Sequence, residues 1–357
     1  MKLNVQEKDD NKLSTITIKD IAKKCHVGVS TVSRAMNDHP DINPETKKKI
    51  LKVIEKSGYV PDNSARNLKR IDARAVAVLI KGIGNTFFNQ LVEVLEQECQ
   101  KERYSCVIQR VEEDENEIDV ALQVAREKKL RGVVFLGGNF SHSGEELGRL
   151  KFPYVLSTVY SGEDNKRIAS VSVDDYKESY KMTEYLLGLG HKKIAIITAR
   201  REDESIGKLR LLGYQKALFD HGIPFDEELV CYMKMNVDRY SYRSGYKLTK
   251  ELLSGKKTFT ALYATSDTLA VGAIRALWEA GIHVPDDCSV AGFDGMDAGK
   301  YSIPGITTIR QPAKEIARAT ADLLFSMIDK KEEPKRVIFE GELIVRESTG
   351  ISRIKIV

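Results

Sequence analysis

Residues 18–37 read IKDIAKKCHVGVSTVSRAMN and predict two short helices joined by a tight break. Thr17 and Asp20 have the spacing of a capping box, so we expect the first helix to open after Thr17. The break is CHVG, residues 25–28, and a second helix of about nine residues follows it. The inward faces are apolar, with Ile18, Ile21 and Ala22 on the first helix and Val32, Ala35 and Met36 on the second.

A third helix is predicted after Asn43 and Pro44, which have the residue types of an N-cap and a first helical position. Its apolar residues are Ile50, Leu51, Val53 and Ile54. Two short helices joined by a tight turn and supported by a third form a helix-turn-helix, which we place at residues 15–60 after a disordered tail, 1–14.

The outward face of the second helix has the side chains that a DNA major groove accepts. Val29 offers a small apolar contact, Ser30 a hydroxyl, and Arg34 a forked donor that fits guanine. Short polar residues near the helix ends are suited to phosphates: Thr17, Thr31, Ser33, Asn37 and Asn43. Any small three-helix domain has polar exposed residues, so the spacing favours DNA binding without proving it.

Charge points the same way. Residues 15–70 contain twelve Lys or Arg against six Asp or Glu, an excess of six positive charges in a chain whose total is +4. The basic excess is therefore confined to the N-terminal segment, as expected of a domain that neutralises phosphates. A solvated charged face is the alternative that charge alone leaves open.

The run quoted above, followed by INPETKKKI (42–50) and GYVPDNSARNL (58–68), resembles the DNA-binding domain and hinge of the lactose repressor/galactose repressor (LacI/GalR) family of bacterial transcription regulators. The resemblance implies that Val29, Ser30 and Arg34 contact bases. The DNA-contacting set expected from the resemblance also includes Gly28, Asn63, Ser64, Ala65 and Leu68. The family usually has Gly in the turn where this chain has His26, so we expect a His at positive φ with modest strain.

Residues 59–70, YVPDNSARNLKR, begin like a helix but are too short to remain helical alone. We assign residues 61–74 to a hinge helix and linker that is mobile without operator and helical with it. Ala65 would allow two copies to approach closely. Leu68 matches the family's leucine that wedges between base pairs from the minor groove.

From Ala75 onward, short apolar runs alternate with amphipathic ones, which predicts parallel sheets covered by helices on both faces. At least nine candidate strands favour two doubly wound lobes. The core, 75–357, resembles the family's periplasmic-binding-protein-like core, whose chain crosses between lobes three times. We place the N-lobe at about 75–173 and 311–333, and the C-lobe at about 174–310 and 334–357.

Ligands of such sheets bind beyond the carboxyl ends of the strands. The polar residues that fall there are Thr158, Asp174, Ser266, Asp267 and Asp294, with Phe87 and Phe88 after the first core strand. The resemblance implies that Arg210 and Asp294 bind the effector, with Phe88 and Tyr240 as aromatic faces. An Arg and an Asp that bond vicinal hydroxyls between rings would suit a sugar or nucleoside, although these two residues could instead pair with each other.

Two residues depart from the family pattern, because Ser266 stands where many members have Asn and Thr158 where many have Asp. Both shorten the polar group, so the site would admit a bulkier ligand or use water bridges. We therefore assign no particular sugar.

The sequence lacks the enzyme motifs that we considered. The segment ending in Gly255 and Lys256 has Lys250 where a P-loop needs glycine, and neither G-x-S-x-G nor H-E-x-x-H occurs. Five dispersed cysteines without a C-x-x-C pair suggest reduced packing residues, and no metal or cofactor is expected. No apolar run approaches a membrane span and the start lacks a signal-peptide pattern, so we expect a cytoplasmic, soluble protein.

The sequence thus predicts a non-enzymatic, sequence-specific transcription regulator, most often a repressor of carbohydrate-utilisation genes in this family. It would bind a pseudo-palindromic operator as a homodimer, with a small-molecule effector between the core lobes changing operator affinity. The alternative is a solute-binding module whose helix-turn-helix is vestigial or serves protein contacts.

Overall fold

A computed structural model describes residues 16–36, 39–59, 74–82, 85–112, 114–138, 142–159, 168–202, 204–234, 240–255 and 257–352. The predicted tail and residues 61–73 of the predicted hinge lie outside these ranges, and so do Asn37, Asn63, Ser64, Ala65 and Leu68. The chain divides into two units, Met1–Asp72 and Ala73–Val357. None of the helices within these ranges is long and apolar enough to span a membrane.

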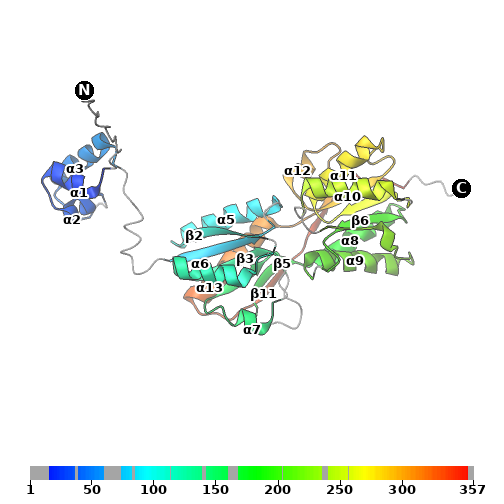
Figure 1. Cartoon of the computed structure of the whole chain (residues 1–357), viewed down its shortest axis with the longest axis horizontal. Coiled ribbons are helices and arrows are strands. Elements are labelled where there is room, and N and C mark those ends of the chain that lie inside the picture. Colours follow the sequence, from blue (N-terminus) through cyan, green and yellow to red (C-terminus); the bar gives the residue numbers. More distant parts are fainter. Residues whose placement is uncertain are drawn as a thin grey trace, which may run out of the picture. The chain divides into compact units, whose positions relative to one another are not determined.

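The first unit is helical, as predicted (Figure 1). Its helices are α1 (Ile18–Cys25), α2 (Val29–Met36) and α3 (Pro44–Ser57). Their shared core is small and fully apolar, consisting of Ile21, Ala22, Cys25, Val32, Ala35 and Ile50. Leu51, one position beyond Ile50, turns outward and is exposed. The packing of α2 between α1 and α3 leaves one face of α2 free.

The caps at α1 and α3 explain where these helices begin. Thr17 and Asp20 form the predicted capping box, in which the Thr17 amide and hydroxyl donate to the Asp20 carboxylate at 2.9 and 2.6 Å. The Asn43 side chain accepts the Glu45 and Thr46 amides at 2.9 and 3.2 Å. His26 ends α1 at φ 57°, in the left-handed conformation expected for it.

The second unit contains two lobes, each a six-stranded sheet with helices on both faces (Figure 1). The N-lobe sheet has the order β11-β5-β4-β3-β1-β2 and is parallel throughout. Its strands are β1 (Ala75–Lys81), β2 (Ser105–Val111), β3 (Leu130–Gly137), β4 (Tyr154–Ser157), β5 (Ser170–Val173) and β11 (Arg336–Phe339). Its helices are α5 (Phe87–Lys101), α6 (Glu117–Lys128), the short α7 (Gly144–Leu147) and α13 (Ala313–Asp329).

The C-lobe sheet has the order β12-β10-β9-β8-β6-β7, with only β12 antiparallel among its described pairs. Its strands are β6 (Ile194–Thr198), β7 (Val230–Tyr232), β8 (Ala261–Ala264), β9 (Ser289–Asp294), β10 (Thr307–Arg310) and β12 (Glu342–Ile344). Its helical segments are α8 (Asp175–Gly188), α9 (Ile206–Asp220), the 3₁₀ turn η1 (Glu227–Leu229), α10 (Tyr242–Ser254), α11 (Asp267–Glu279) and α12 (Asp297–Lys300).

Successive side chains along a strand point to opposite faces of the sheet and pack in two separate cores. On β6, Ile194 and Ile196 face α8 and α9, whereas Ala195 and Ile197 face α10 and α11. Glycines let the covering helices pair closely. A Cβ atom at Gly213 of α9 would lie 2.2 Å from the Tyr176 carbonyl of α8, and α10 approaches α11 in the same way.

The chain passes from one sheet to the other between β5 and β6, between β10 and α13, and between β11 and β12. The last passage corrects our boundary at residue 334. β11 pairs with β5 of the N-lobe sheet, so the crossing comes after Phe339 and residues 336–339 belong to the N-lobe. Pro334 lies in the connection between the end of α13 at Asp329 and the start of β11, so it does not mark the end of the lobe. The predicted fold class is otherwise confirmed for both units.

Candidate functional sites

The outward face of α2 carries the predicted base-reading side chains. Val29, Ser30 and Arg34 are all exposed, whereas Val32 and Ala35 on the opposite side are buried. Gly28 is exposed before the first turn, and Thr31 and Ser33 are half-buried along the flanks. An apolar side chain, a hydroxyl and a guanidinium therefore share one solvent-facing surface of a short helix, which is the arrangement that a major groove accepts.

Thr17 and Asn43 lie at the amino ends of α1 and α3. Both were expected to touch phosphates, yet their side chains are engaged as helix caps. A capped helix start still presents backbone N–H groups and the positive end of the helix dipole, both of which attract phosphate. These residues can thus position phosphates through the helix ends that they stabilise.

In the core, a buried charge network joins Arg210 of α9 to two carboxylates. The Arg210 Nε and Nη2 atoms both lie 2.8 Å from Oδ1 of Asp175, and Nη1 donates to the Thr265 carbonyl at 2.5 Å. Nη2 also lies 3.7 Å from Oδ1 of Asp294. The guanidinium carbon is 3.6 Å from the centroid of the Phe293 ring. The Arg210–Asp294 pairing that the sequence left open is therefore present, but Asp175 is the closer partner.

Asp175 was missed by sequence reasoning, which chose its neighbour Asp174. Asp174 caps α8 by accepting the Lys177 amide at 3.0 Å, whereas the carboxylates nearest Arg210 are those of Asp175 and Asp294. Both acids follow β5 directly, and only the start of α8 decides which one turns inward. The two adjacent acids in SVSVDD indicate that a carboxylate follows β5. They do not indicate which one caps α8 and which one pairs with Arg210.

Burial dominates the ionisation of this network. It raises the pKa of Asp175 and of Asp294 to about 6, although Arg210 opposes the shift in both. Burial alone would lower the pKa of Arg210, but the two carboxylates hold it above its ordinary value. Asp267, fully buried at the start of α11, has its pKa raised to about 8 by burial and by Asp294.

Asp294 has features of a ligand-facing group. Its Oδ1 accepts from the Gln311 amide at 2.8 Å, while its Oδ2 is buried without a hydrogen-bond partner. The side chain of Asn85, which follows β1 of the N-lobe, lowers the pKa of the same carboxylate. Groups from both lobes therefore converge on Asp294, and one strong acceptor atom remains unused.

Backbone strain singles out the same region. Among the described residues, seven non-glycine residues have positive φ, and four of these lie one or two positions after a helix end. The other three are Thr158, Tyr240 and Asp294, all predicted effector contacts. Thr158 is β-branched, which makes φ 64° unusual, and its buried hydroxyl has no hydrogen-bond partner. Strain of this kind concentrates at functional sites.

The remaining predicted residues divide between the lobes. Ser266 is buried beside Thr268, 2.5 Å between hydroxyl oxygens, and Thr268 in turn donates to the Tyr240 carbonyl, which places these residues together in the C-lobe. Phe88 is buried in the N-lobe, where its ring fills the space that a Cβ at Gly137 would occupy. The structure thus brings Arg210, Asp294, Ser266 and Tyr240 into one lobe and keeps Phe88 and Thr158 in the other.

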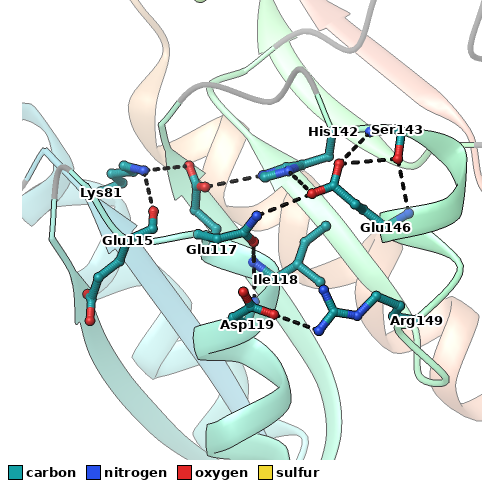
Figure 2. Close-up of polar contacts among 10 residues, drawn as sticks. Lys81, Glu115, Glu117, Ile118, Asp119, His142, Ser143, Glu146 and Arg149 are labelled. Carbon is teal, nitrogen blue, oxygen red and sulfur yellow. Dashed lines mark hydrogen bonds and ion pairs between the residues drawn. The ribbon is translucent and has the colours of Figure 1, made fainter.

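A second polar cluster lies in the N-lobe around Glu117, the first residue of α6 (Figure 2). The Glu117 carboxylate, at the first residue of α6, lies 3.4 Å from Lys81 Nζ and 3.2 Å from His142 Nε2. Burial alone would raise the pKa of Glu117, but His142 and Lys81 hold it below its ordinary value, and the same contact raises the pKa of His142. We assign this cluster a structural role, because its charges compensate one another. Within the described residues, no His, Cys, Asp and Glu group suited to a metal ion occurs.

Comparisons with known proteins find similar families for both units of the chain. Residues 17–62 match the family described as "Bacterial regulatory proteins, lacI family", and residues 183–349 match "Periplasmic binding protein-like domain". The chain is 38% identical to the HTH-type transcriptional regulator MalR of Clostridium butyricum, over 93% of this chain and 99% of the relative.

Solved structures show the same architecture. A "transcriptional regulator CelR-cellobiose complex" matches at a TM-score of 0.68 and 27% identity, covering 93% of this chain and 99% of the other. A lac repressor dimer bound to operator matches at a TM-score of 0.74 and 22% identity, covering 94% of this chain and 100% of the other, and supports the fold alone.

Proposed function

Because the chain belongs to the lacI family of bacterial regulatory proteins, we propose that it represses carbohydrate-utilisation genes by binding a pseudo-palindromic operator as a homodimer. The chain is a DNA-binding transcription regulator with a periplasmic-binding-protein-like core. The observation that carries the proposal is the free face of α2, where Val29, Ser30 and Arg34 are exposed together. Each recognition helix would enter the major groove of one half-site.

Dimerisation is supported by the need for two reading helices and by apolar surface on the C-lobe. Tyr301 and Ile303, just after α12, are 73% and 95% exposed. We take these two side chains as part of a surface that a partner covers. A second copy of this chain is the partner that a pseudo-palindromic site requires.

The effector would bind where Asp294 and Thr158 offer unused polar atoms. Asp294 Oδ2 would accept a hydroxyl of the ligand, and Thr158 Oγ1 would meet it from the N-lobe. Arg210 would act mainly by orienting Asp294, since Asp175 and the Thr265 carbonyl already occupy most of its donors. Sugars and their derivatives fit this chemistry, and the relative CelR was solved with cellobiose.

Effector and operator would be linked reciprocally. If the ligand favours one arrangement of the lobes and the operator favours another, each weakens binding of the other by the same factor. If the ligand and the operator instead favour the same arrangement of the lobes, each strengthens binding of the other and the ligand acts as a co-repressor. Operator binding measured with and without the ligand decides between the two cases.

A gel-shift titration tests operator binding. The intact protein should retard a fragment of its own promoter more than an unrelated duplex, with affinity falling steeply as salt rises. A candidate sugar that binds should change this retardation. Equal retardation of both duplexes, with and without sugars, contradicts the proposal and favours the solute-binding module.

A thermal-shift screen with sugars, sugar phosphates and nucleosides tests the effector site, because a ligand that binds only the folded protein raises its Tm. Thr158→Val keeps the branched shape and removes the hydroxyl, so it should reduce the ligand-induced shift. Thr249→Val is the matched control, since the buried Thr249 hydroxyl bonds the Gly245 carbonyl of its own helix. Equal ligand shifts in the two variants would exclude Thr158 from the site.

A further inference from the structure

Two cysteines meet at the outer edge of the N-lobe sheet. Cys99 lies in the last turn of α5 and is buried, and Cys106 is the second residue of β2 and is partly exposed. Both side chains pack in the same apolar core of the N-lobe, and each thiol shifts the pKa of the other. The tight turn between them is fixed by the Tyr104 amide, which donates to the Cys99 carbonyl at 2.8 Å.

The strand register explains why the thiols face each other. Cys106 is paired with Val76 of β1, and Val76 points into the core that α5 covers. Cys106 therefore points to the same side and packs against that core. Because β2 is the last strand of its sheet, the thiol keeps a route to solvent that Cys99 lacks.

The pKa values of the two thiols shift in opposite directions. Cys99 stabilises a Cys106 thiolate and lowers the pKa of Cys106, while Cys106 and burial raise the pKa of Cys99. Burial raises the pKa of Cys231 and of Cys288 to about 12. A partly exposed thiol whose pKa is lowered by a neighbouring thiol is the arrangement that favours reversible oxidation.

We propose that Cys99 and Cys106 are a redox modification site, at which a hydroperoxide converts the two thiols into a reversible disulfide. The Cys106 thiolate attacks the peroxide, a sulfur–oxygen bond forms, the oxygen–oxygen bond breaks, and the alcohol or water product leaves after taking a proton. Cys99 then attacks the Cys106 sulfur, the sulfur–oxygen bond breaks, and water leaves with the Cys99 proton. Sulfur is oxidised and the peroxide is reduced, with one disulfide formed per peroxide.

The disulfide would join α5 to the edge strand through a short closed loop. It constrains the unfolded chain, so the oxidised protein should resist thermal unfolding more than the reduced protein. α5 also begins with Phe87 and Phe88, so oxidation would stiffen the helix that carries the predicted aromatic contact of the effector.

Peptide mapping of the full-length protein tests the site. The reduced protein is treated with hydrogen peroxide, its free thiols are alkylated, and it is digested with trypsin. Cleavage after Lys101 and Arg103 places Cys99 and Cys106 on separate peptides, so only a disulfide keeps them together. We expect this linked pair as the main oxidised product, lost on reduction with dithiothreitol.

Variants assign the roles. Cys99→Ser should accumulate a Cys106 sulfenic acid that dimedone traps, and Cys106→Ser should show neither product at residue 99. Cys231→Ser is the matched control, because Cys231 also lies in an edge strand, and it should form the linked pair like the wild type. Wild-type protein that yields no linked pair, a scrambled set of pairs, or a Cys106 bridge between two copies would overturn the proposal.

Discussion

Removal of the Asp175 carboxylate should destabilise the core strongly, because it leaves the buried Arg210 charge with one carboxylate, the more distant Asp294. Arg210 is 2% exposed and has two contacts of 2.8 Å to Asp175. Breaking a buried ion pair from one side costs about 3–5 kcal/mol. Asp294 remains, but at 3.7 Å and already bonded to Gln311, so it compensates only in part. We expect Asp175→Ala to lower the free energy of unfolding by about 3 kcal/mol.

The assay is urea unfolding of the full-length protein followed by far-UV circular dichroism at pH 8, above the pKa of about 6 for Asp175. Asp175→Asn removes the charge but keeps an acceptor for Arg210, so its cost should be smaller than that of Asp175→Ala. Lys177→Ala is the control from the same helix, because it breaks an exposed ion pair with Glu340. If Asp175→Ala shifts the midpoint no more than Lys177→Ala, the buried network does not stabilise the core as argued.

Two further changes test other parts of the structure. His26→Gly should stabilise the helical unit by about 0.5–1 kcal/mol. A residue with a Cβ atom costs roughly 1–2 kcal/mol in the left-handed conformation, and glycine avoids this cost. Part of the gain is lost because glycine has more conformational freedom in the unfolded chain. Slower amide exchange in α1 and α2 would show it, and unchanged exchange would mean that His26 is unstrained. Asp267→Asn should flatten the stability profile between pH 6.5 and 8. The folded-state pKa of about 8 lies above the ordinary 3.8, so the folded protein holds a proton and loses stability as pH rises towards 8. Equal slopes in the two proteins would show that Asp267 is ionised throughout.

Much of the fold was predictable because local signals and tertiary packing agree. The capping box at Thr17, the N-cap at Asn43 and the left-handed His26 all follow from residue type and spacing, and each appears as predicted. Short apolar runs likewise predicted the buried strands. These features depend on contacts within a few residues, which a sequence displays directly.

The features that we did not predict depend on contacts between residues far apart in the chain. Asp175 meets Arg210 across 35 positions, and nothing local distinguishes it from Asp174. The placement of β11 in the N-lobe required its pairing with β5, more than 160 residues away. The strained φ of Thr158 and Asp294 has no sequence signature, since neither residue type demands it.

Selection of binding sites from random duplex DNA tests the central claim most directly. Wild-type protein should enrich a pseudo-palindrome with two half-sites. Arg34→Ala should lose about 1–3 kcal/mol of discrimination at one base pair of each half-site, whereas Lys56→Ala, an equal loss of charge on α3, should keep the preference. Enrichment of no palindrome, or uniform weakening of all sequences by Arg34→Ala, would contradict the account of α2 as the helix that reads the operator.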